Sequence, residues 1–583
     1  MIASGARAST EHSFITWDGV ELFYRAWLPA TPRLKALVLF HRGHEHSGRF
    51  QEMVDLLGLE DFSIFAWDAR GHGRSPGERG YAESFSCLVK DADAFVEHVC
   101  SHYRIPMKNT GILAVSVGAV VIAAWVHDYA PPIRVLVLGS PALRVKLYVP
   151  FALFFLRLQL MVQGKAFVQS YVKAKMLTHD PKECETYAND TLITRSIAVN
   201  ILIGMHDTAT RLLADASAIL PPTLVLTSGK DWVVKIPPQR RFFSRLPSPQ
   251  KQMQEYPGYF HDLFHELGRG EPIAKSREFI LQSFASSYSP LSLAEGERNR
   301  PELERLSEML SPLSPMWWFW GAQRLFLKTI GRLSKGVQVG WRYGFDSGES
   351  LDHVYQNKAQ GITPLGRLID AIYLSSPGWK GIRQRKVHLK TLLHRAIEQV
   401  HQAGHPVHLL DVATGGGRYV LETMRESSEI PMSAVLRDWS ESNVEAVTRL
   451  AGEFGLTNVS VMKGDAFDRQ SLASNYPRPS IAIVSGLYEL FPDNRMVARS
   501  LLGISEALAD AGYLIYTNQP WHPQLEMIAR VLDNREGKPW VMRCRAQAEM
   551  DELVRAAGFT KLDMLIDEQG IFTVSLAQRR NGS

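Results

Sequence analysis

Residues 111–119 read Gly-Ile-Leu-Ala-Val-Ser-Val-Gly-Ala, an apolar run that ends at a serine followed by small residues. The run before Ser116 has the length and composition of a buried β-strand, and the apolar residues 118–125 predict a helix directly after it. Ser116 is therefore expected at a strand-to-helix corner. A sharp turn there lifts the hydroxyl off the sheet, and small neighbours let strand and helix approach closely. The pattern is G-x-S-x-G, except that Ala114 replaces the first glycine.

Length and composition limit the class of protein. A chain of 583 residues is too long for a single core and fits about two to four domains. Its 65 basic and 60 acidic residues leave a net charge of only +5, with no basic tract, which argues against a nucleic-acid partner. The four cysteines are far apart and fit neither a disulfide framework nor a zinc site. Residues 1–13 lack the features of a signal peptide, so we expect a cytoplasmic protein.

Further strand-like runs place an acid and a histidine downstream of Ser116. Asp231 follows the apolar run 223–227, and His261 follows the run 251–256. Serine, acid and histidine in this order form the catalytic triad of one class of hydrolases. In such a triad His261 removes the proton of Ser116 and later protonates the leaving alcohol, while Asp231 holds the imidazole tautomer. His265 lacks the glutamate of an H-E-x-x-H zinc motif and is expected to be structural.

The segment 41–49, His-Arg-Gly-His-Glu-His-Ser-Gly-Arg, follows the continuous apolar run 36–40. Its histidines and glutamate raise the question of a metal site, but their spacing matches no zinc pattern, and we expect no metal. A flexible loop at this place instead predicts an oxyanion hole, in which backbone N–H groups bind the negative oxygen of a tetrahedral intermediate. The candidate donors are the N–H groups of Gly43 and Val117.

These motifs carry a family resemblance. Residues 41–49, the segment 67–75 (Trp-Asp-Ala-Arg-Gly-His-Gly-Arg-Ser) and the serine corner resemble the monoacylglycerol lipase and lysophospholipase branch of the α/β-hydrolases, which includes serine aminopeptidase-like proteins. The resemblance covers about residues 10–287. It implies an α/β-hydrolase fold, a helical cap over about residues 141–220 and hydrolysis of an ester in a lipid-like substrate. One departure is Arg42, where the family has glycine.

Two apolar stretches are candidates for membrane contact. Residues 147–162 are short and interrupted by Pro150, Arg157 and Gln159, whereas a spanning helix needs about 20 apolar residues. We expect part of a mobile cap or a surface-seeking helix there, or a simple buried helix. Residues 316–333 combine aromatic side chains with Arg and Lys, which fits a membrane interface or a helix that docks one domain on the other. Peripheral contact with the inner face of the membrane is therefore an expectation for both stretches.

The second half of the chain begins after a change in composition that indicates a domain boundary. Residues 287–301 are rich in Ser, Pro and charge and indicate a linker. The expected organisation is a hydrolase domain over 1–287, a linker with the aromatic helix over 288–335, and a second domain over 336–583. In that domain the strand-like run 407–410 leads into Asp411, Ala413 and Gly415-Gly416-Gly417, followed by a helix. A glycine loop between strand and helix lets a ligand lie against bare backbone at a helix N-terminus.

The neighbouring strand ends distinguish two cofactor classes. The dinucleotide pattern G-x-G-x-x-G fails because Ala413 replaces its first glycine and the later spacing differs. Asp411 instead precedes the loop, Asp438 ends the next strand, and Asp465 and Ala466 follow the strand 459–463. These positions resemble class I S-adenosylmethionine-dependent methyltransferases, with Asp438 at the ribose and the Asp465 loop at the adenine. The resemblance implies a Rossmann-like fold, S-adenosylmethionine as cofactor, and helices over about 336–404 that cover the cofactor site.

The methyl acceptor is less defined by the sequence. No N-P-P-Y segment follows the fourth strand, which argues against nucleic-acid methylation and favours a small molecule or lipid head group. Candidates for a base are Tyr488, Glu489 and His522. The domain order resembles bacterial fusions of a lipase-like hydrolase and a methyltransferase, and we expect a bifunctional enzyme whose two sites act on one metabolite. Two alternatives remain: a lipid-binding first domain without catalysis, or a degenerate second domain. The sequence indicates no oligomeric state.

Overall fold

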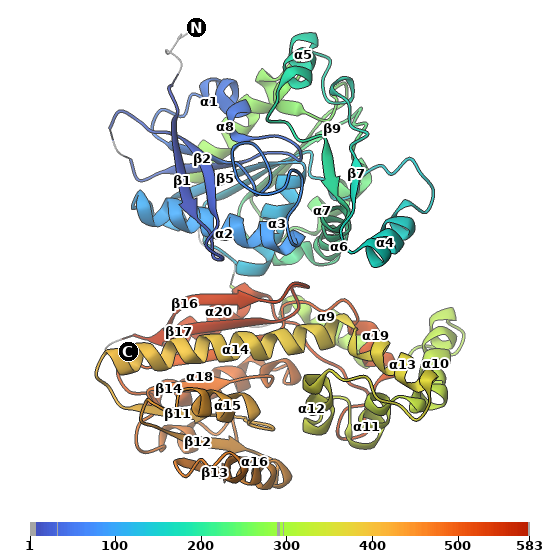
Figure 1. Ribbon diagram of the computed structural model, residues 1–583. Coiled ribbons are helices and arrows are strands. Elements are labelled where there is room, and N and C mark those ends of the chain that lie inside the picture. The colour runs from blue at the N-terminus through green and yellow to red at the C-terminus, as the bar shows by residue number, and fades with distance from the viewer. Residues whose placement is uncertain (1–6, 32, 288–291, 295–296, 581–583) are drawn as a thin grey trace. The chain divides into compact units, whose positions relative to one another are not determined.

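The computed structural model describes residues 7–31, 33–287, 292–294 and 297–580. The chain divides into two compact units, Met1–Leu291 and Ser292–Ser583, each with its own sheet (Figure 1). Parts of the expected linker, residues 288–291 and 295–296, lie outside the described residues. None of the described helices is long and apolar enough to cross a membrane.

The first unit is built on an eight-stranded sheet in the order β1-β2-β4-β3-β5-β6-β9-β10. β2 pairs antiparallel with both β1 and β4, and all other pairs are parallel. The continuous apolar runs became central strands because both faces of the sheet are covered. The strands are β1 (Thr10–Ile15), β2 (Glu21–Trp27), β3 (Ala36–Phe40), β4 (Ser63–Trp67), β5 (Thr110–Val115), β6 (Val135–Gly139), β9 (Thr223–Ser228) and β10 (Lys251–Tyr256).

Helices cover both faces of this sheet. One core packs α2 (Phe85–His102), α3 (Val117–Tyr129) and α6 (Val199–Asp215) against it, and the other packs α1 (Gln51–Leu57) and α8 (Gly270–Ala285). α7 (Ile236–Arg245) links β9 to β10. The expected α/β-hydrolase fold is confirmed. β1, which the sequence analysis did not predict, is an edge strand.

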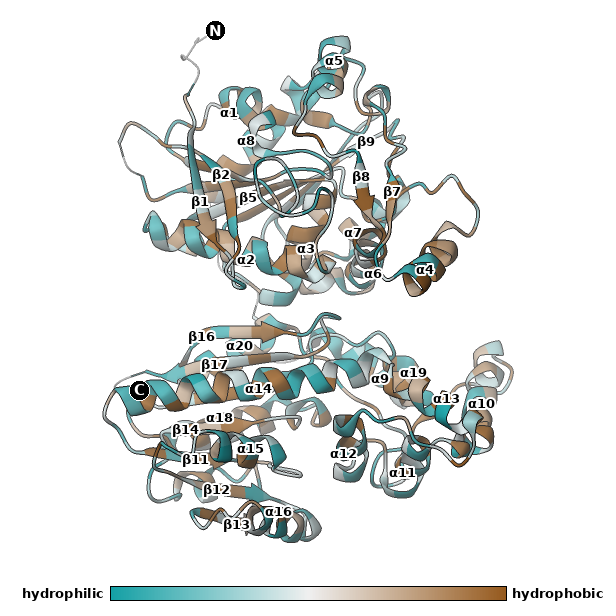
Figure 2. Ribbon diagram, viewed as in Figure 1, coloured by the Kyte–Doolittle hydropathy of each residue, from teal (hydrophilic) through white to brown (hydrophobic). Residues whose placement is uncertain are grey.

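The expected cap is the insertion between β6 and β9. It contains α4 (Ala152–Gln163), β7 (Phe167–Gln169), α5 (Pro181–Asn189), β8 (Ser196–Ala198) and α6. α4 has no buried residue, and Phe151, Phe154 and Met161 are 79%, 63% and 77% exposed. Figure 2 shows this short helix as strongly apolar. The buried-helix alternative for residues 147–162 is therefore wrong.

The second unit is built on a seven-stranded sheet in the order β13-β12-β11-β14-β15-β17-β16. β17 lies antiparallel between β15 and β16, and the other pairs are parallel, as expected for a class I methyltransferase fold. β16 was not predicted from the sequence. The strands are β11 (Val407–Asp411), β12 (Met432–Asp438), β13 (Val459–Lys463), β14 (Ile481–Val484), β15 (Tyr513–Asn518), β16 (Phe559–Ile566) and β17 (Thr573–Arg579).

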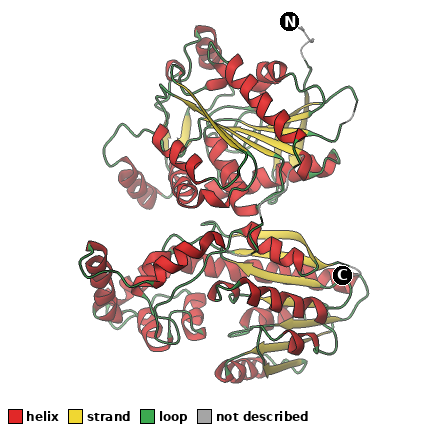
Figure 3. Cartoon of the chain, turned by 180° about the vertical axis from the view of Figure 1, so that it is seen from behind, coloured by secondary structure: helices red, strands yellow, loops and turns green. Residues whose placement is uncertain are grey.

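Two helical layers enclose this sheet (Figure 3). α14 (Pro377–Gln402), α15 (Arg418–Glu426) and α16 (Glu441–Glu453) share one core, and α17 (Arg469–Ala473), α18 (Asn494–Ala507) and α20 (Gln547–Ala556) share the other. The remaining helices form a separate cluster around a third core. They are α9 (Arg300–Ser307), α10 (Pro315–Lys328), α11 (Lys335–Tyr343), α12 (Gly348–Gln356), α13 (Pro364–Leu374) and α19 (Leu525–Val531).

The aromatic helix of residues 316–333 is α10, and it belongs to the second unit rather than to a separate linker segment. Trp320 and Leu327 pack into the third core beside Ile528 of α19. The opposite face of α10 is exposed, with Trp318 65% and Leu325 64% accessible.

Candidate functional sites

Ser116, His261 and Asp231 form a continuous hydrogen-bond chain in the first unit. Oγ of Ser116 lies 2.8 Å from Nε2 of His261, and Nδ1 of His261 lies 2.7 Å from Oδ2 of Asp231. The three residues follow β5, β10 and β9, whose carboxyl ends share one edge of the sheet. All three side chains are buried. The structure therefore brings the three predicted residues into triad geometry.

Asp231 is held in place by more than its histidine. Its Oδ1 accepts the backbone N–H groups of Val233 and Val234 at 2.7 and 2.8 Å. Burial alone would raise the pKa of Asp231, but its interaction with His261 and these hydrogen bonds lower it below its usual range. The carboxylate therefore stays ionised at neutral pH and fixes the imidazole.

The corner at Ser116 is strained and tightly packed. Ser116 has φ +54°, a conformation that L-residues rarely adopt, and it caps the N-terminus of α3. A Cβ at Gly118 would lie 2.4 Å from the backbone oxygen of His41, so only glycine lets the helix approach the loop after β3. A Cβ at Gly43 would lie 2.9 Å from Cγ2 of Val117. The two predicted oxyanion donors are thus on neighbouring backbone segments.

Arg42, the residue that departs from the family pattern, has its side chain in a buried cluster of charged residues. Its buried guanidinium pairs with Glu45 at 2.8 Å and with Asp262 at 3.2 Å, and it lies over the ring of Tyr187 in the cap. Although burial opposes it, the charges of His265 and Arg42 lower the pKa of Asp262. Arg42 therefore ties the loop after β3 to the residue that follows His261.

His265 is structural, as expected. Its Nδ1 lies 3.1 Å from the carboxylate of Asp262, and its Nε2 lies 3.1 Å from the backbone oxygen of Arg49. The cap is held to the same region, because Asp262 donates its backbone N–H to Leu177 at 2.9 Å. His46 also contacts Asp190 of the cap at 2.9 Å. The triad loops and the cap therefore form one packed assembly.

The glycine loop of the second unit lies between β11 and α15. Gly415 and Gly417 have φ of +55° and +62°, and a Cβ at Gly415 or Gly416 would meet no other atom within 4 Å. The loop is therefore open on the side where a ligand would lie. Ala413, which replaces the first glycine of a dinucleotide motif, is partly buried against the core.

Two hydrogen bonds join the three predicted loops. The N–H of Gly415 donates to Oδ2 of Asp438 at 2.9 Å, and the N–H of Gly464 donates to the backbone oxygen of Asp438 at the same distance. Asp465 follows immediately, and its carboxylate accepts the N–H of Phe467 at 2.9 Å. Ala466 is buried in the adjoining core. The ends of β11, β12 and β13 therefore meet around Asp438.

Asp411 is the electrostatic centre of this site. It is fully buried, and its Oδ2 accepts the hydroxyl hydrogen of Tyr419 at 2.7 Å. Burial, with a smaller contribution from the nearby carboxylate of Asp438, raises the pKa of Asp411 to about 7, although the hydrogen bond from Tyr419 lowers it. No cationic side chain forms an ion pair with Asp411 among the residues that the structure describes. Sequence reasoning missed Tyr419, although its place in the first turn after the glycine loop was a usable signal.

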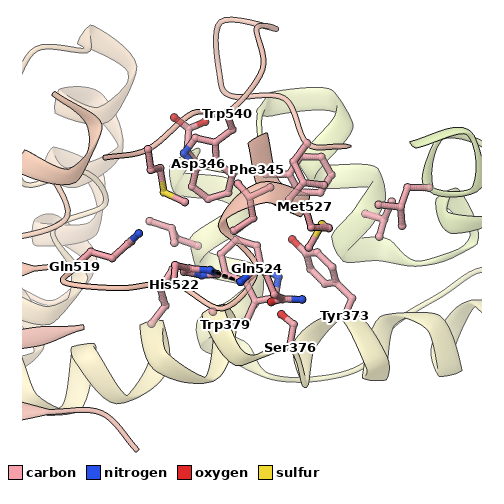
Figure 4. Close-up of a pocket in the computed structure, with 18 of the residues that line it drawn as sticks. Phe345, Asp346, Tyr373, Ser376, Trp379, Gln519, His522, Gln524, Met527 and Trp540 are labelled. Carbon is pink, nitrogen blue, oxygen red and sulfur yellow. Dashed lines mark hydrogen bonds between the residues drawn. The ribbon is translucent and has the colours of Figure 1, made fainter. Parts of the chain in front are cut away.

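The three candidate bases are not equivalent. Tyr488 donates its hydroxyl hydrogen to Ser500 at 3.0 Å and is buried in the core. Nδ1 of His522 accepts the N–H of Gln524 at 3.0 Å, and burial lowers the pKa of His522 to about 3. A neutral His522 therefore carries its proton on Nε2 and has no free lone pair. Of the three, only Glu489 combines a carboxylate oxygen that has no hydrogen-bond partner among the described residues with a place in a cavity beside β14 and β15. His522 lines the same cavity (Figure 4).

Comparison with known proteins assigns both units. The family model described as "Putative methyltransferase" matches residues 276–579, just over half of the chain. The chain belongs to this family. A second model, "Serine aminopeptidase, S33", matches residues 31–268, so the protein is an α/β-hydrolase fused to a methyltransferase-type domain.

Individual relatives agree with this architecture. "Uncharacterized protein YnbC" of Escherichia coli is 47% identical over 582 residues, which cover 99% of both chains. The monoacylglycerol lipase of Mycolicibacterium smegmatis is 26% identical over 258 residues, 44% of this chain and 91% of that protein. The crystal structure of Paleococcus ferrophilus monoacylglycerol lipase is 24% identical, with a TM-score of 0.41, and covers 45% of this chain and 99% of that chain. The two family models confirm the expected fusion of an α/β-hydrolase with a methyltransferase-type domain.

Proposed function

We propose that the first unit is a serine hydrolase that cleaves a carboxylic ester of a lipid-like substrate of the monoacylglycerol or lysophospholipid class. The observation that carries this proposal is the buried chain from Ser116 through His261 to Asp231. The substrate class rests on the monoacylglycerol lipases among the relatives and on the exposed apolar helix of the cap.

In this reaction His261 accepts the proton of Ser116 at Nε2 while Oγ attacks the ester carbonyl. Asp231 holds the proton on Nδ1 and stabilises the imidazolium that forms. The N–H groups of Gly43 and Val117 bind the oxyanion, and the imidazolium then returns its proton to the leaving alcohol. Water, deprotonated by His261, releases the acid from Ser116 by the same route.

We infer that the second unit transfers a methyl group from S-adenosylmethionine to a small molecule or lipid head group. The residues fit this cofactor, because its sulfonium and ammonium groups are cations and Asp411 is a buried carboxylate without a cationic partner. When bound, the cofactor supplies an electrophilic methyl group. Asp438 would accept hydrogen bonds from vicinal hydroxyls, Gly415–Gly417 would let the ligand lie against the backbone, and Asp465 with Ala466 would border the adenine.

The four cysteines are far apart in the sequence and fit no disulfide framework, which favours a cytoplasmic location for both activities. We infer small-molecule or lipid substrates and no nucleic-acid partner. The two sites would act in sequence on one metabolite, deacylation exposing the group that is methylated.

The decisive experiment treats the full chain with a fluorophosphonate probe and measures S-adenosylmethionine binding by calorimetry. Wild type is expected to be labelled and to bind the cofactor. Ser116→Ala should lose labelling and keep cofactor binding. Asp411→Asn should keep labelling and bind the cofactor more weakly. An unlabelled wild type would favour a lipid-binding first unit, and absence of binding a degenerate second unit. Lipid and metabolite profiles then test whether the compound that accumulates in Asp411→Asn is the deacylated form of the compound that accumulates in Ser116→Ala.

A further inference from the structure

The second unit contains a cavity of about 490 Å³ whose lining does not include the glycine loop. Helices α10, α11, α13 and α14 and the segments after β14 and β15 wall it (Figure 4). Its volume is that of an ordinary ligand site, since such sites span about 300 to 1,000 Å³. The lining is mainly aromatic and aliphatic and includes Phe345, Tyr373, Trp379, Met527, Trp540 and Phe572.

One polar pair interrupts this apolar lining. Arg385 of α14 and Glu489 after β14 are both buried, with Nη1 of the arginine 3.1 Å from Oε1 of the glutamate. Nε of Arg385 and Oε2 of Glu489 have no hydrogen-bond partner among the described residues. A buried charged pair with two unsatisfied atoms favours a polar ligand group at this place.

The polar pair also lies next to the proposed cofactor site. Tyr419, which donates to Asp411, lies within electrostatic reach of Arg385. A Cβ at Gly486, which follows β14, would lie 3.2 Å from Nη2 of Arg385. Arg385 therefore links the cavity electrostatically to Tyr419, the partner of Asp411 in the proposed cofactor site.

The other side of the cavity reaches the surface through apolar residues. Phe326 of α10 and Ile372 of α13 line the cavity and are 47% and 65% exposed. The same two helices carry further exposed apolar side chains: Trp317, Trp318, Phe319, Leu325, Leu365 and Leu368. Residues 311–344 contain five basic residues and no acidic residue. Exposed aromatics beside basic side chains complement a membrane surface with anionic lipids.

We propose that this cavity holds the methyl acceptor, that the acceptor is an amphiphile with a hydrocarbon chain, and that α10 and α13 take it from an anionic lipid bilayer. The inference rests on the proposed methyltransferase function and specifies its substrate class. The chain occupies the apolar cavity, and the polar end lies at Arg385 and Glu489. The acceptor's oxygen or nitrogen forms a bond to the methyl carbon as the carbon–sulfur bond breaks with its electron pair moving to sulfur. The acceptor's proton passes to Oε2 of Glu489.

The membrane step is tested by sedimentation of the full chain with vesicles of phosphatidylcholine alone or mixed with phosphatidylglycerol. Wild type should bind the anionic vesicles, and the double variant Trp318→Glu/Leu325→Glu should bind about tenfold more weakly or less. Leu562→Glu, at a position 49% exposed on β16, is the matched control and should bind like wild type. Loss in Phe154→Glu but not in the α10 variant would assign the contact to the cap and overturn this step.

The cavity is tested with cis-parinaric acid, a fluorescent fatty acid, and with radiolabelled S-adenosylmethionine. Ile369→Trp narrows the cavity and should weaken fatty-acid binding by about tenfold or more, while cofactor binding is unchanged. Label should enter the organic phase of lipid vesicles with wild type but not with Glu489→Gln. Normal cofactor binding with label only in water-soluble products would overturn the acceptor class and leave the methyltransferase intact. Absence of cofactor binding would overturn both.

Discussion

The two candidate sites differ in how much of the chemistry the protein itself supplies. In the first unit Ser116, His261 and Asp231 already hydrogen-bond to one another, and the acid has its charge compensated. In the second unit the partners of the buried Asp411 are neutral groups, chiefly the hydroxyl of Tyr419, and its pKa is raised. A site whose reacting groups are all side chains has its charges balanced without a ligand. In a site that binds a cationic cofactor, the charge of the protein's carboxylate is balanced only when that cofactor binds.

The largest effect is expected for Asp231→Asn, which tests whether the first site depends on its own charged group. The change removes the group that selects the imidazole tautomer, so kcat for ester hydrolysis should fall on the order of 10⁴-fold. Hydrolysis of a 4-nitrophenyl ester measures this, and calorimetry should show unchanged S-adenosylmethionine binding. A loss below about tenfold would mean that other groups orient His261.

Gly118→Ala tests whether the first site depends on close backbone packing. The new Cβ would lie 2.4 Å from the oxygen of His41, so the unfolding free energy of the first unit should fall by about 2–4 kcal/mol. Calorimetric unfolding, with loss of fluorophosphonate labelling on heating as the marker of this unit, measures the change. Gly270→Ala, where a Cβ meets no atom within 4 Å, is the control and should remain close to wild type.

Asp411→Asn tests whether the carboxylate charge of Asp411 contributes to cofactor binding in the second site. Only the ionised carboxylate attracts a cationic ligand, so wild-type affinity for S-adenosylmethionine should increase as pH rises through about 7. The asparagine variant should bind about 10- to 100-fold more weakly above that pH and lose the pH dependence. Calorimetry across this range measures both effects, and equal pH profiles would contradict the assignment.

The same variant has a predicted effect on stability. The pKa of Asp411 is above its ordinary value of 3.8 in the folded chain, so the folded state binds the proton more tightly than the unfolded state. Wild type without ligand should therefore lose stability as pH rises from about 4 to about 7, and Asp411→Asn should lose less. Denaturant unfolding of the second unit at several pH values measures this difference.

Tyr419→Phe should give the smallest effect. It removes one hydrogen bond to Asp411 without changing the formal charge, so S-adenosylmethionine should bind about three- to tenfold more weakly at pH 7. The midpoint of the pH dependence should also shift upward, because the hydroxyl stabilises the ionised carboxylate. An unchanged midpoint would show that Tyr419 does not control the charge of Asp411.

The sequence was most informative where a continuous apolar run predicted a central strand and a chemically reactive residue followed directly after it. The central strands are buried on both faces, so they are continuous apolar runs, and the residues that follow them meet at one edge of the sheet. This is why Ser116, Asp231 and His261 could be grouped before their distances were known. β1 and β16 lie at sheet edges, where burial is partial and the pattern is weaker.

The cavity and the ion clusters could not be predicted in the same way. Arg42 and Asp262 are 220 positions apart in the chain, and no local pattern indicates that a buried arginine will find a buried acid. The cavity lining comes from helices and loops spread between Gln323 and Phe572. Such sites depend on tertiary packing, which residue spacing does not determine.

The position of the long helix α14 limits where substitutions could change the acceptors that the second unit binds. Its first turns, including Trp379 and Arg385, line the cavity, while its later turns from Leu389 to Val400 pack in the core against the sheet. The same helix therefore lines the cavity and packs against the sheet. Variation that widens the range of acceptors should therefore be placed in α10, α11 and α13, because reshaping α14 would move the sheet that holds the methyl donor.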